Sequence, residues 1–172
     1  MIRNVLKYFH FVSKKIRQLI FTALVKMETK NYGDGLKVNH YSKVTRYTIL
    51  GKNVNFNGMN ISGKGTVTIG SNFHSGTECK MITDFHNYEG ESIPYDDSYI
   101  SKSISVEDNV WFGSHVLILG GVSIGEGAII QAGSTVVHDI PACAIAGGHP
   151  AEVFKYRDKA HYYLLKEQGK VF

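Results

Sequence analysis

A six-residue period runs through the centre of this chain and constrains its fold more than any other feature. Six apolar residues recur at this spacing in one frame. Because hydrophobic residues make up 43% of the sequence, six out of six at this spacing arises by chance with a probability of about 1 in 100 or less. These residues are Val106, Phe112, Ile118, Ile124, Ile130 and Val136. A second column, four residues later, is apolar or small throughout: Val110, Val116, Val122, Ala128, Ser134 and Ile140.

Such a period is typical of a chain that makes a short strand, turns, and continues on the next face of a prism. Each strand points one side chain inward, and stacked coils pair their backbones with the coils above and below. A weaker block shows the same pattern at Val38, Val44, Leu50 and Phe56, then in a slipped frame at Ile69, Ser75 and Met81. Glycines between the columns are expected at turns of positive φ: Gly113, Gly121, Gly125, Gly127 and Gly133.

The repeat is interrupted between Phe85 and Ser105 by a polar and aromatic stretch. We predict a loop over residues 86–104 that protrudes from the repeat. Long loops in compact domains often carry function. The repeat itself is assigned to residues 31–150, and residues 151–172, which lose the period, are predicted to be a C-terminal helical segment that helps to cover an end of the prism.

Residues 1–30 are predicted to form a separate N-terminal segment, with an amphipathic helix over residues 1–27. Apolar residues recur on one face, at Ile2, Val5, Phe9, Val12, Ile16, Leu19 and Ala23. Residues 1–30 hold seven Lys or Arg and one Glu, a net charge of +6, whereas the whole chain carries +4. Two alternatives follow: the helix packs on its own body or a partner subunit, or it lies in the surface of an anionic membrane.

Composition excludes several classes of protein. Because the positive charge belongs to the N-terminal arm, the body does not have the basic surface of a nucleic-acid-binding domain. The two cysteines, Cys79 and Cys143, are too few for a disulfide scaffold and favour a reducing compartment. The chain has no apolar run near the ~20 residues of a membrane span. No second His stands five residues from His115, so we expect no zinc site.

Several segments resemble the hexapeptide-repeat acyltransferases, and specifically the branch that acetylates galactosides, maltose and xenobiotics, as well as many O-acetyltransferases of bacterial surface polysaccharides. The resemblance covers residues 36–157. It is carried by Asp108-Asn-Val-Trp-Phe-Gly-Ser-His-Val, Ile124-Gly-Glu-Gly-Ala, Ala132-Gly-Ser, Asp139-Ile-Pro and Ala146-Gly-Gly-His-Pro-Ala. It implies an all-β core folded as a left-handed parallel β-helix, a homotrimer, and acetyl-CoA bound in the cleft between neighbouring prisms.

The resemblance also implies site residues. A His that follows the segment Thr66 to Gly70 is the family's general base, and His86 stands at that place. Asp84, Tyr88 and Glu89 are candidates for contacts with the acceptor, although Asp84 is equally well read as a solvated carboxylate. Tyr88, Tyr95 and Tyr99 either stack on a sugar ring or pack the loop. The candidates for CoA are Trp111, Ser114, Ala132, Gly133, His138, Gly148, Lys155 and Arg157, the last two as phosphate ligands or as solvated charges.

Three positions depart from the family pattern. Val137-His138 replaces a Thr-Lys pair whose Lys meets a CoA phosphate, and His149 replaces the usual Asn or Val before the Pro of a tight turn. Lys64 stands where galactoside enzymes place an Asp for the acceptor. The last departure indicates an acceptor other than a simple galactoside.

These features favour an acetyl-CoA-dependent O-acetyltransferase that modifies a sugar hydroxyl of a surface polysaccharide or its precursor. The reaction needs a proton acceptor and no metal. Alternatives are N-acetylation of a nucleotide-linked amino sugar, acetylation of an antibiotic, and a non-catalytic β-helix scaffold. The expected location is the cytoplasm, with the basic helix at the inner membrane surface.

Overall fold

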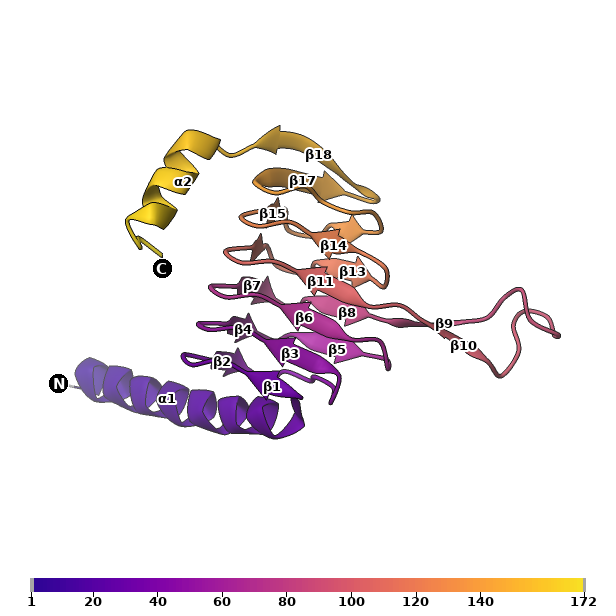
Figure 1. The fold of residues 1–172 in the computed structure, drawn as a ribbon. Helices are drawn as coiled ribbons and strands as arrows, with labels where there is room; N and C mark the ends of the chain where they lie inside the picture. The colour runs from indigo at the N-terminus through magenta and orange to yellow at the C-terminus, as the bar shows by residue number, and fades with distance from the viewer. Residues whose placement is uncertain (1, 172) are drawn as a thin grey trace.

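The computed structural model describes residues 2–171, with side chains for residues 11–171, and shows a three-walled prism of stacked coils (Figure 1). The first wall contains β1 (Asn31–Tyr32), β3 (Thr48–Leu50), β6 (Val67–Ile69), β11 (Ile104–Val106) and β14 (Ser123–Ile124). The second contains β2 (Lys37–His40), β4 (Asn55–Asn57), β7 (His74–Thr77), β12 (Trp111–Phe112), β15 (Ile129–Ile130), β17 (Ala144–Gly148) and β18 (Ala151–Tyr156). The third contains β5 (Asn60–Ser62), β8 (Lys80–Ile82), β13 (Leu117–Leu119) and β16 (Thr135–Val136).

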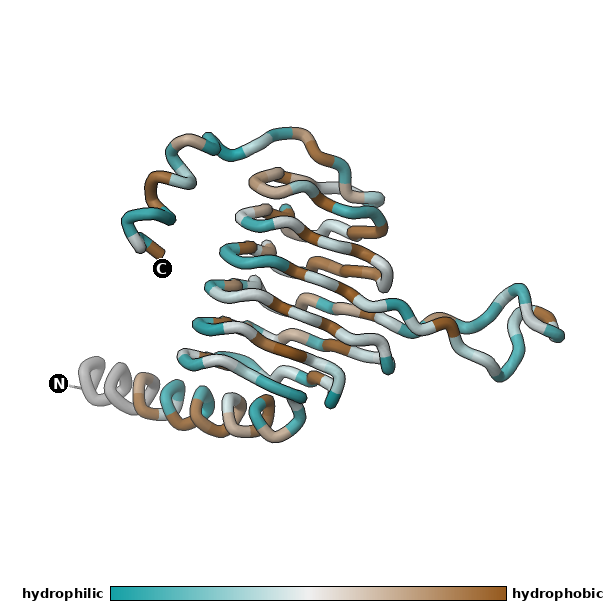
Figure 2. The backbone as a smooth tube through the Cα atoms, viewed as in Figure 1, coloured by the Kyte–Doolittle hydropathy of each residue, from teal (hydrophilic) through white to brown (hydrophobic). Residues whose placement is uncertain are grey.

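Each coil visits the first, second and third walls in turn, so neighbouring strands within a wall are parallel. The pair β17 and β18 is the exception, because β18 returns antiparallel along the edge of the second wall. Hydropathy alternates around each coil in Figure 2, with brown segments on the walls and teal segments at many corners. This alternation is the three-dimensional form of the six-residue period.

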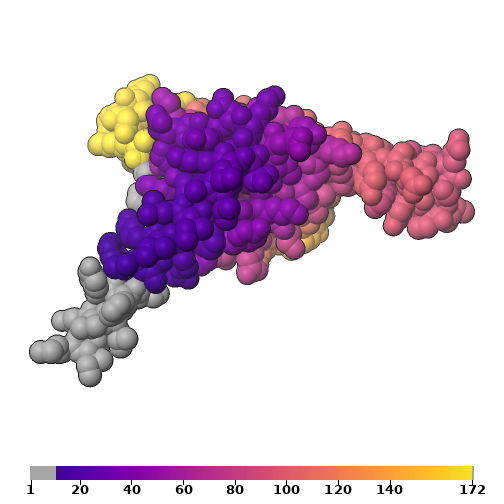
Figure 3. All heavy atoms as spheres, turned by 90° about the horizontal axis from the view of Figure 1, so that it is seen from below, coloured from indigo at the N-terminus to yellow at the C-terminus, as the bar shows by residue number. Residues whose placement is uncertain are grey.

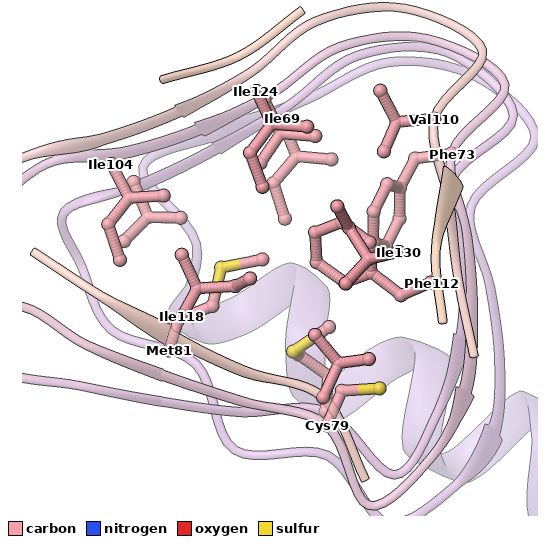
Figure 4. Close-up of a cluster of buried hydrophobic side chains, with 14 of the residues drawn as sticks. Ile69, Phe73, Cys79, Met81, Ile104, Val110, Phe112, Ile118, Ile124 and Ile130 are labelled. Carbon is pink, nitrogen blue, oxygen red and sulfur yellow. The ribbon is translucent and has the colours of Figure 1, made fainter. Parts of the chain in front are cut away.

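The interior is filled by the columns that the sequence predicted. All six residues of the main column and all six of the second are buried, and the earlier block from Val38 to Met81 is buried as well. Figure 4 shows side chains from the three walls pointing toward one another inside the prism. Aromatic rings continue from coil to coil: Phe56 lies edge-on to Phe73, whose ring centroid is 4.9 Å from that of Phe112. Cys79 is also buried, as expected for a core residue.

The corners use glycine for two different reasons, and the expectation of positive φ at all five glycines is wrong for two of them. Gly127 has φ +69°, and Gly121 and Gly133 are likewise positive. Gly113 and Gly125 have no positive φ; a Cβ on Gly113 would lie 2.5 Å from the backbone nitrogen of Ala132 in the next coil. Close stacking of the coils therefore requires glycine there.

The two ends of the prism are closed differently. The predicted N-terminal helix is present as α1 (Ile2–Glu28), and it crosses the base of the prism beneath β2 (Figure 1). The prediction of helix over residues 151–172 is wrong for residues 151–156, which form β18; helix α2 covers only Lys159–Glu167. Strand β18 supplies hydrogen-bonding partners to the outer edge of β17. The six-residue period does not predict such an edge strand, because the period describes only the stacked coils. Ile2, Val5 and Phe9 of the predicted stripe lie outside the residues whose side chains are described.

The interruption of the repeat forms a long hairpin that extends away from the prism (Figure 1). Its arms are β9 (Asp84–His86) and β10 (Tyr99–Ser101), paired antiparallel with Tyr99 opposite His86 and Ser101 opposite Asp84. The hairpin leaves the prism after β8 and returns to β11, at the corner between the third and first walls.

Candidate active site

The imidazole of His86 lies at the outer end of β9, where the ordered ladder gives way to the loop. Its ring stacks on Tyr95, with centroids 3.8 Å apart and planes 18° from parallel. Tyr99 lies on the partner strand with its centroid at 4.6 Å. The side chain is nevertheless exposed. Two rings of the hairpin therefore orient the imidazole while leaving it open to solvent and to ligands.

Asp84 ties the root of the hairpin to the coil below. Its carboxylate accepts hydrogen bonds from the backbone N–H of Lys64 at 2.8 Å and from the hydroxyl of Ser101 at 2.7 Å. Burial raises the pKa of Asp84, but these hydrogen bonds outweigh it, so the pKa lies below its usual value. The buried neighbour Thr83 donates to the carbonyl of Ser62 and accepts from the N–H of Gly65. Asp84 is thus engaged in holding the strand that carries His86.

The tip of the hairpin is organised by a residue that the sequence analysis did not single out. The carboxylate of Asp96 accepts from the hydroxyl and N–H of Ser98 and from the N–H of Glu91. Hydrogen bonds from Ser98 are the largest cause of its lowered pKa. The predicted acceptor contacts Tyr88 and Glu89 are exposed beside this tip. An acid two residues before a Ser in a loop is a common turn-forming pattern. This pattern in the sequence could have indicated the structural role of Asp96.

A different part of the molecule holds most of the predicted CoA residues. Ser114 lies at the corner between the second and third walls, and Gly133 lies in the next coil directly above it, with its N–H donating to the carbonyl of Ser114 at 2.8 Å. Ala132 is exposed beside them, and Gly148 follows one coil further on, its N–H donating to the hydroxyl of Ser134 at 3.2 Å. No atom lies within 4 Å of a Cβ built on Gly133. These small residues, Ser114, Ala132, Gly133 and Gly148, form an open surface that we call the ledge.

Trp111 stands on the second wall beside this ledge, with 52% of its surface exposed. In the same wall it pairs with Ile129, Ile129 pairs with Ile145, and Ile145 pairs with Lys155 of β18. Trp111 and the exposed Lys155 therefore lie along one row that crosses successive coils. A flat aromatic ring, small residues and a free ammonium suit a long thiol cofactor that carries phosphates.

Arg157 and His138 do not join this group. The Nε–H of Arg157 donates to the carbonyl of Gly127 at 2.6 Å, and its guanidinium lies 5.6 Å from the ring centroid of Tyr162. It therefore helps to fasten β18 and α2 at the corner between the first and second walls. His138 is exposed and follows β16. It lies at the same corner as the hairpin but two coils above it.

Comparisons with known proteins agree with the repeat. The model of the bacterial transferase hexapeptide family (six repeats) matches residues 103–138. The galactoside O-acetyltransferase of Escherichia coli K12 is 40% identical over 120 residues, which are 67% of this chain and 58% of that protein. A solved galactoside acetyltransferase in complex with coenzyme A is 28% identical, with a TM-score of 0.64, and covers 81% of this chain and 71% of its own.

The chain contains a hexapeptide-repeat transferase domain. This domain is a left-handed β-helix homologous to that of the galactoside O-acetyltransferases. A hexapeptide-repeat acetyltransferase of Vibrio cholerae complexed with acetyl coenzyme A, 24% identical, shares the fold with a TM-score of 0.64 over 78% of this chain and 74% of its own. The chain spans 58% of the length of the E. coli relative.

Within the hexapeptide-repeat domain, the predicted residues fall into two groups at different corners. His86 lies on the hairpin, which leaves the prism at the corner between the third and first walls. The ledge lies at the corner between the second and third walls. The third wall stands between them. Within one chain, His86 and the ledge are therefore not brought together.

The hexapeptide-repeat domain also has a cavity that the sequence analysis missed. It measures about 410 Å³ and lies between the second wall and α2, lined by His74, Trp111, Arg157, Tyr162, Lys166 and Lys170 among others. Glu126 anchors the helix that covers it, accepting from Lys166 Nζ at 2.6 Å and from the hydroxyl of Tyr162 at 2.9 Å. Burial raises the pKa of Glu126, but the hydrogen bonds from Lys166 and Tyr162 outweigh this effect. The pKa of Glu126 therefore lies below its usual value.

Two kinds of feature are missing from the described residues. No group of three or more His, Cys, Asp or Glu side chains within the described part of the chain is placed to hold a metal ion. Among the same residues, no helix has the length and apolar character to cross a membrane.

Proposed function

We propose that this protein is an acetyl-CoA-dependent acetyltransferase whose acceptor is a sugar hydroxyl. The observation that carries the proposal is His86, an exposed imidazole oriented by Tyr95 and Tyr99 in a hexapeptide-repeat domain homologous to the galactoside O-acetyltransferases. We further propose that the sugar belongs to a surface polysaccharide or to its precursor. Lys64, which occupies the place of an acidic acceptor contact in galactoside enzymes, supports an acceptor other than a simple galactoside.

In the proposed reaction, acetyl-CoA supplies an activated acyl group as a thioester. Neutral His86 accepts the proton of the acceptor hydroxyl while that oxygen attacks the thioester carbonyl carbon. The C–S bond then breaks, and the imidazolium returns the proton to the sulfur, so that free CoA and the sugar ester leave. His86 begins and ends neutral, and the chain forms no covalent bond to the acyl group.

The ledge and Trp111 are the proposed binding surface for the CoA arm. The small residues of the ledge allow close approach of an extended chain, and an exposed indole offers a flat apolar contact. Lys155 is free to pair with a phosphate. Arg157 is proposed only in the secondary role of holding β18, because its Nε–H is already used by Gly127. His138 lies at the corner of the hairpin and not at the corner of the ledge, so we propose no contact between His138 and the CoA arm bound on the ledge of its own chain.

Because His86 and the ledge occupy different corners, we propose that each site joins the hairpin of one subunit to the ledge of the next, in a homotrimer. In a three-fold ring every interface is heterologous, so the corner between the third and first walls of one copy can face the corner between the second and third walls of its neighbour. Asp84 supports this arrangement by fixing the direction in which the hairpin leaves the prism.

The test of the chemistry is release of free CoA from acetyl-CoA in the presence of sugar acceptors. We expect His86→Ala to lower kcat by about 10²–10⁴-fold, the range of a lost general base. His161→Ala, which removes an exposed imidazole on α2, is the matched control and should not change the rate. An unchanged rate for His86→Ala would remove the assignment, and transfer only to amino sugars would turn the proposal toward N-acetylation.

The test of the shared site is complementation between subunits. His86→Ala destroys the hairpin half of the site, and Ala132→Trp blocks the ledge half. In an equimolar random mixture, about a quarter of interfaces pair an intact hairpin with an intact ledge, so about a quarter of the activity should return. No recovery from co-refolded mixtures of confirmed trimers would contradict a site shared between subunits.

A further inference from the structure

Helix α1 packs Val25 and Phe21 on the prism but directs a second set of apolar side chains away from it. The helix contacts the prism through residues three or four apart: Val25 is buried, Gln18 donates to the side chain of Asn39 at 2.6 Å, and the hydroxyl of Thr22 accepts from the N–H of Val38 at 3.0 Å. Since a helix turns about 100° per residue, Ile16, Ile20 and Met27 lie roughly opposite Val25.

The outward side is exposed over its described length. The exposed fractions are 51% for Ile16, 71% for Leu19, 52% for Ile20 and 81% for Met27. We call these four residues the outward apolar face. Seen from below in Figure 3, α1 crosses the underside of the prism, and the coloured part of the chain leaves it uncovered. Of the two alternatives drawn from the sequence, the helix does pack on the chain's own body, through Gln18, Thr22 and Val25, but Ile16 and Leu19 of the predicted stripe stay exposed.

Cations border the outward apolar face. Lys15 and Lys26 lie on one flank and Arg17 on the other, about a quarter turn from the contact with the prism. Between residues 11 and 30, Glu28 is the only acid. Two exposed tyrosines stand beside the end of the helix: Lys26 Nζ lies 5.0 Å from the ring centroid of Tyr32, and Tyr41 lies edge-on to Phe21.

We propose that the outward apolar face is a docking surface for an anionic phospholipid bilayer. Apolar side chains that enter the acyl boundary, flanking cations that meet lipid phosphates, and tyrosines at headgroup depth are the combination that interfacial helices use. A second copy of the chain fits less well, because a contact between two such faces would bring both basic borders together.

The docked orientation has a consequence that rests on the proposed function. With α1 flat on the membrane, the prism stands upright, and the coil that carries His86 lies two strands above β2. Two strand spacings and the thickness of a helix put this coil about 20 Å from the surface. An acceptor sugar carried on a lipid would lie within that range, so the docking surface favours lipid-linked glycans as substrates.

The test is flotation of the full chain with two kinds of vesicle, phosphatidylcholine alone and an equimolar mixture with phosphatidylglycerol. We expect binding to the anionic vesicles only. The double variant Leu19→Ser/Ile20→Ser should weaken the partition coefficient by about a hundredfold. Leu164→Ser, at a leucine of α2 that is as exposed as Ile20, is the matched control and should bind like the parent protein.

A charge variant, Lys15→Gln/Arg17→Gln/Lys26→Gln, should bind the anionic vesicles about a hundredfold more weakly, because each cation near a lipid surface contributes about 1 kcal/mol. Circular dichroism and the mass in solution establish that each variant is folded and keeps its assembly. No binding by the parent chain, or unchanged binding by the Leu19/Ile20 variant, overturns the proposal. A fall in mass for that variant, without vesicle binding by the parent, identifies the face as a contact between copies. Vesicle binding needs no catalysis, so its outcome is independent of His86.

Discussion

The prism and the hairpin are made from one chain but stabilised in different ways. In the prism, each inward side chain is buried by the coils above and below it, and Phe56, Phe73 and Phe112 form a continuous series of edge-to-face contacts. In the hairpin, three residue pairs form the ladder between β9 and β10, and Ile93 near the tip is 99% exposed. The prism gains stability from apolar burial, whereas the hairpin depends on carboxylates that accept hydrogen bonds.

This difference explains where a reactive imidazole can be placed. A side chain inside the prism is out of reach of a substrate, and one at the hairpin tip has little to orient it. His86 lies at the junction, held by a strand that Asp84 fixes to the coil below and by the rings of Tyr95 and Tyr99. Rigid placement and open access are combined at that point.

The largest expected effect is on the prism. Phe112→Ala should lower the free energy of unfolding by about 3–5 kcal/mol, because it leaves a cavity against Phe73 and removes apolar contacts in the core. Urea denaturation followed by circular dichroism measures this change. Ile93→Ala removes an apolar side chain from the hairpin tip and should change the unfolding free energy by less than about 0.5 kcal/mol. Equal losses for the two variants would contradict the contrast between the regions.

The next effect is on the root of the hairpin. Asp84→Ala removes the acceptor for Lys64 N–H and the Ser101 hydroxyl, and should lower the free energy of local opening by about 1 kcal/mol. Hydrogen exchange over residues 84–101 should quicken while exchange in β12 and β13 stays the same. We also expect kcat to fall although His86 is present. Asp97→Ala, an exposed acid of the same hairpin, is the control, and an equal effect there would show that Asp84 has no special role.

A smaller effect is expected at α2. Glu126→Gln keeps the shape of the side chain but removes its charge, so the attraction of Lys166 is lost at a cost of about 0.5–1 kcal/mol to the docking of α2. Limited trypsin digestion at Lys159 and Lys166 should become faster, with the prism intact. Glu167→Gln on the same helix is exposed and should leave the digestion rate unchanged. Faster digestion in both variants would assign the effect to the helix charge in general.

The smallest effect is that of acid on the hairpin. The pKa values of Asp84 and Asp96 are lowered in the folded protein, so both carboxylates contribute stability above their unfolded pKa of about 4, and this contribution is lost as the pH falls below that value through the folded pKa. Tyrosine fluorescence and hydrogen exchange of residues 84–101 should report opening of the hairpin below about pH 4, before the prism unfolds. Simultaneous loss of both regions would contradict the contrast.

Much of the fold could be predicted from the sequence because the repeat is local. A period of six specifies which side chain of each coil points inward, and the predicted columns from Val106 and Val110 are all buried. The break in that period indicated the protruding segment, although the predicted bounds of 86–104 differ from the hairpin, which begins at Asp84 and ends before Ile104 of β11. Residues 151–156 could not be assigned in this way. They form β18 by pairing with the open edge of β17, and that edge forms only when the strands of the second wall have come together.

The sequence by itself thus determined the prism, its core and the place of His86 at the edge of the repeat, because inward and outward positions follow from spacing alone. Tertiary structure decided that Tyr95 and Tyr99 flank His86, that Arg157 donates to Gly127, and that His86 and the ledge lie at different corners. It also decided which apolar residues of α1 face outward, namely Ile16, Leu19, Ile20 and Met27, and that Val25 faces the prism. Each of these depends on how distant segments meet around the prism, which a pattern along the chain does not contain.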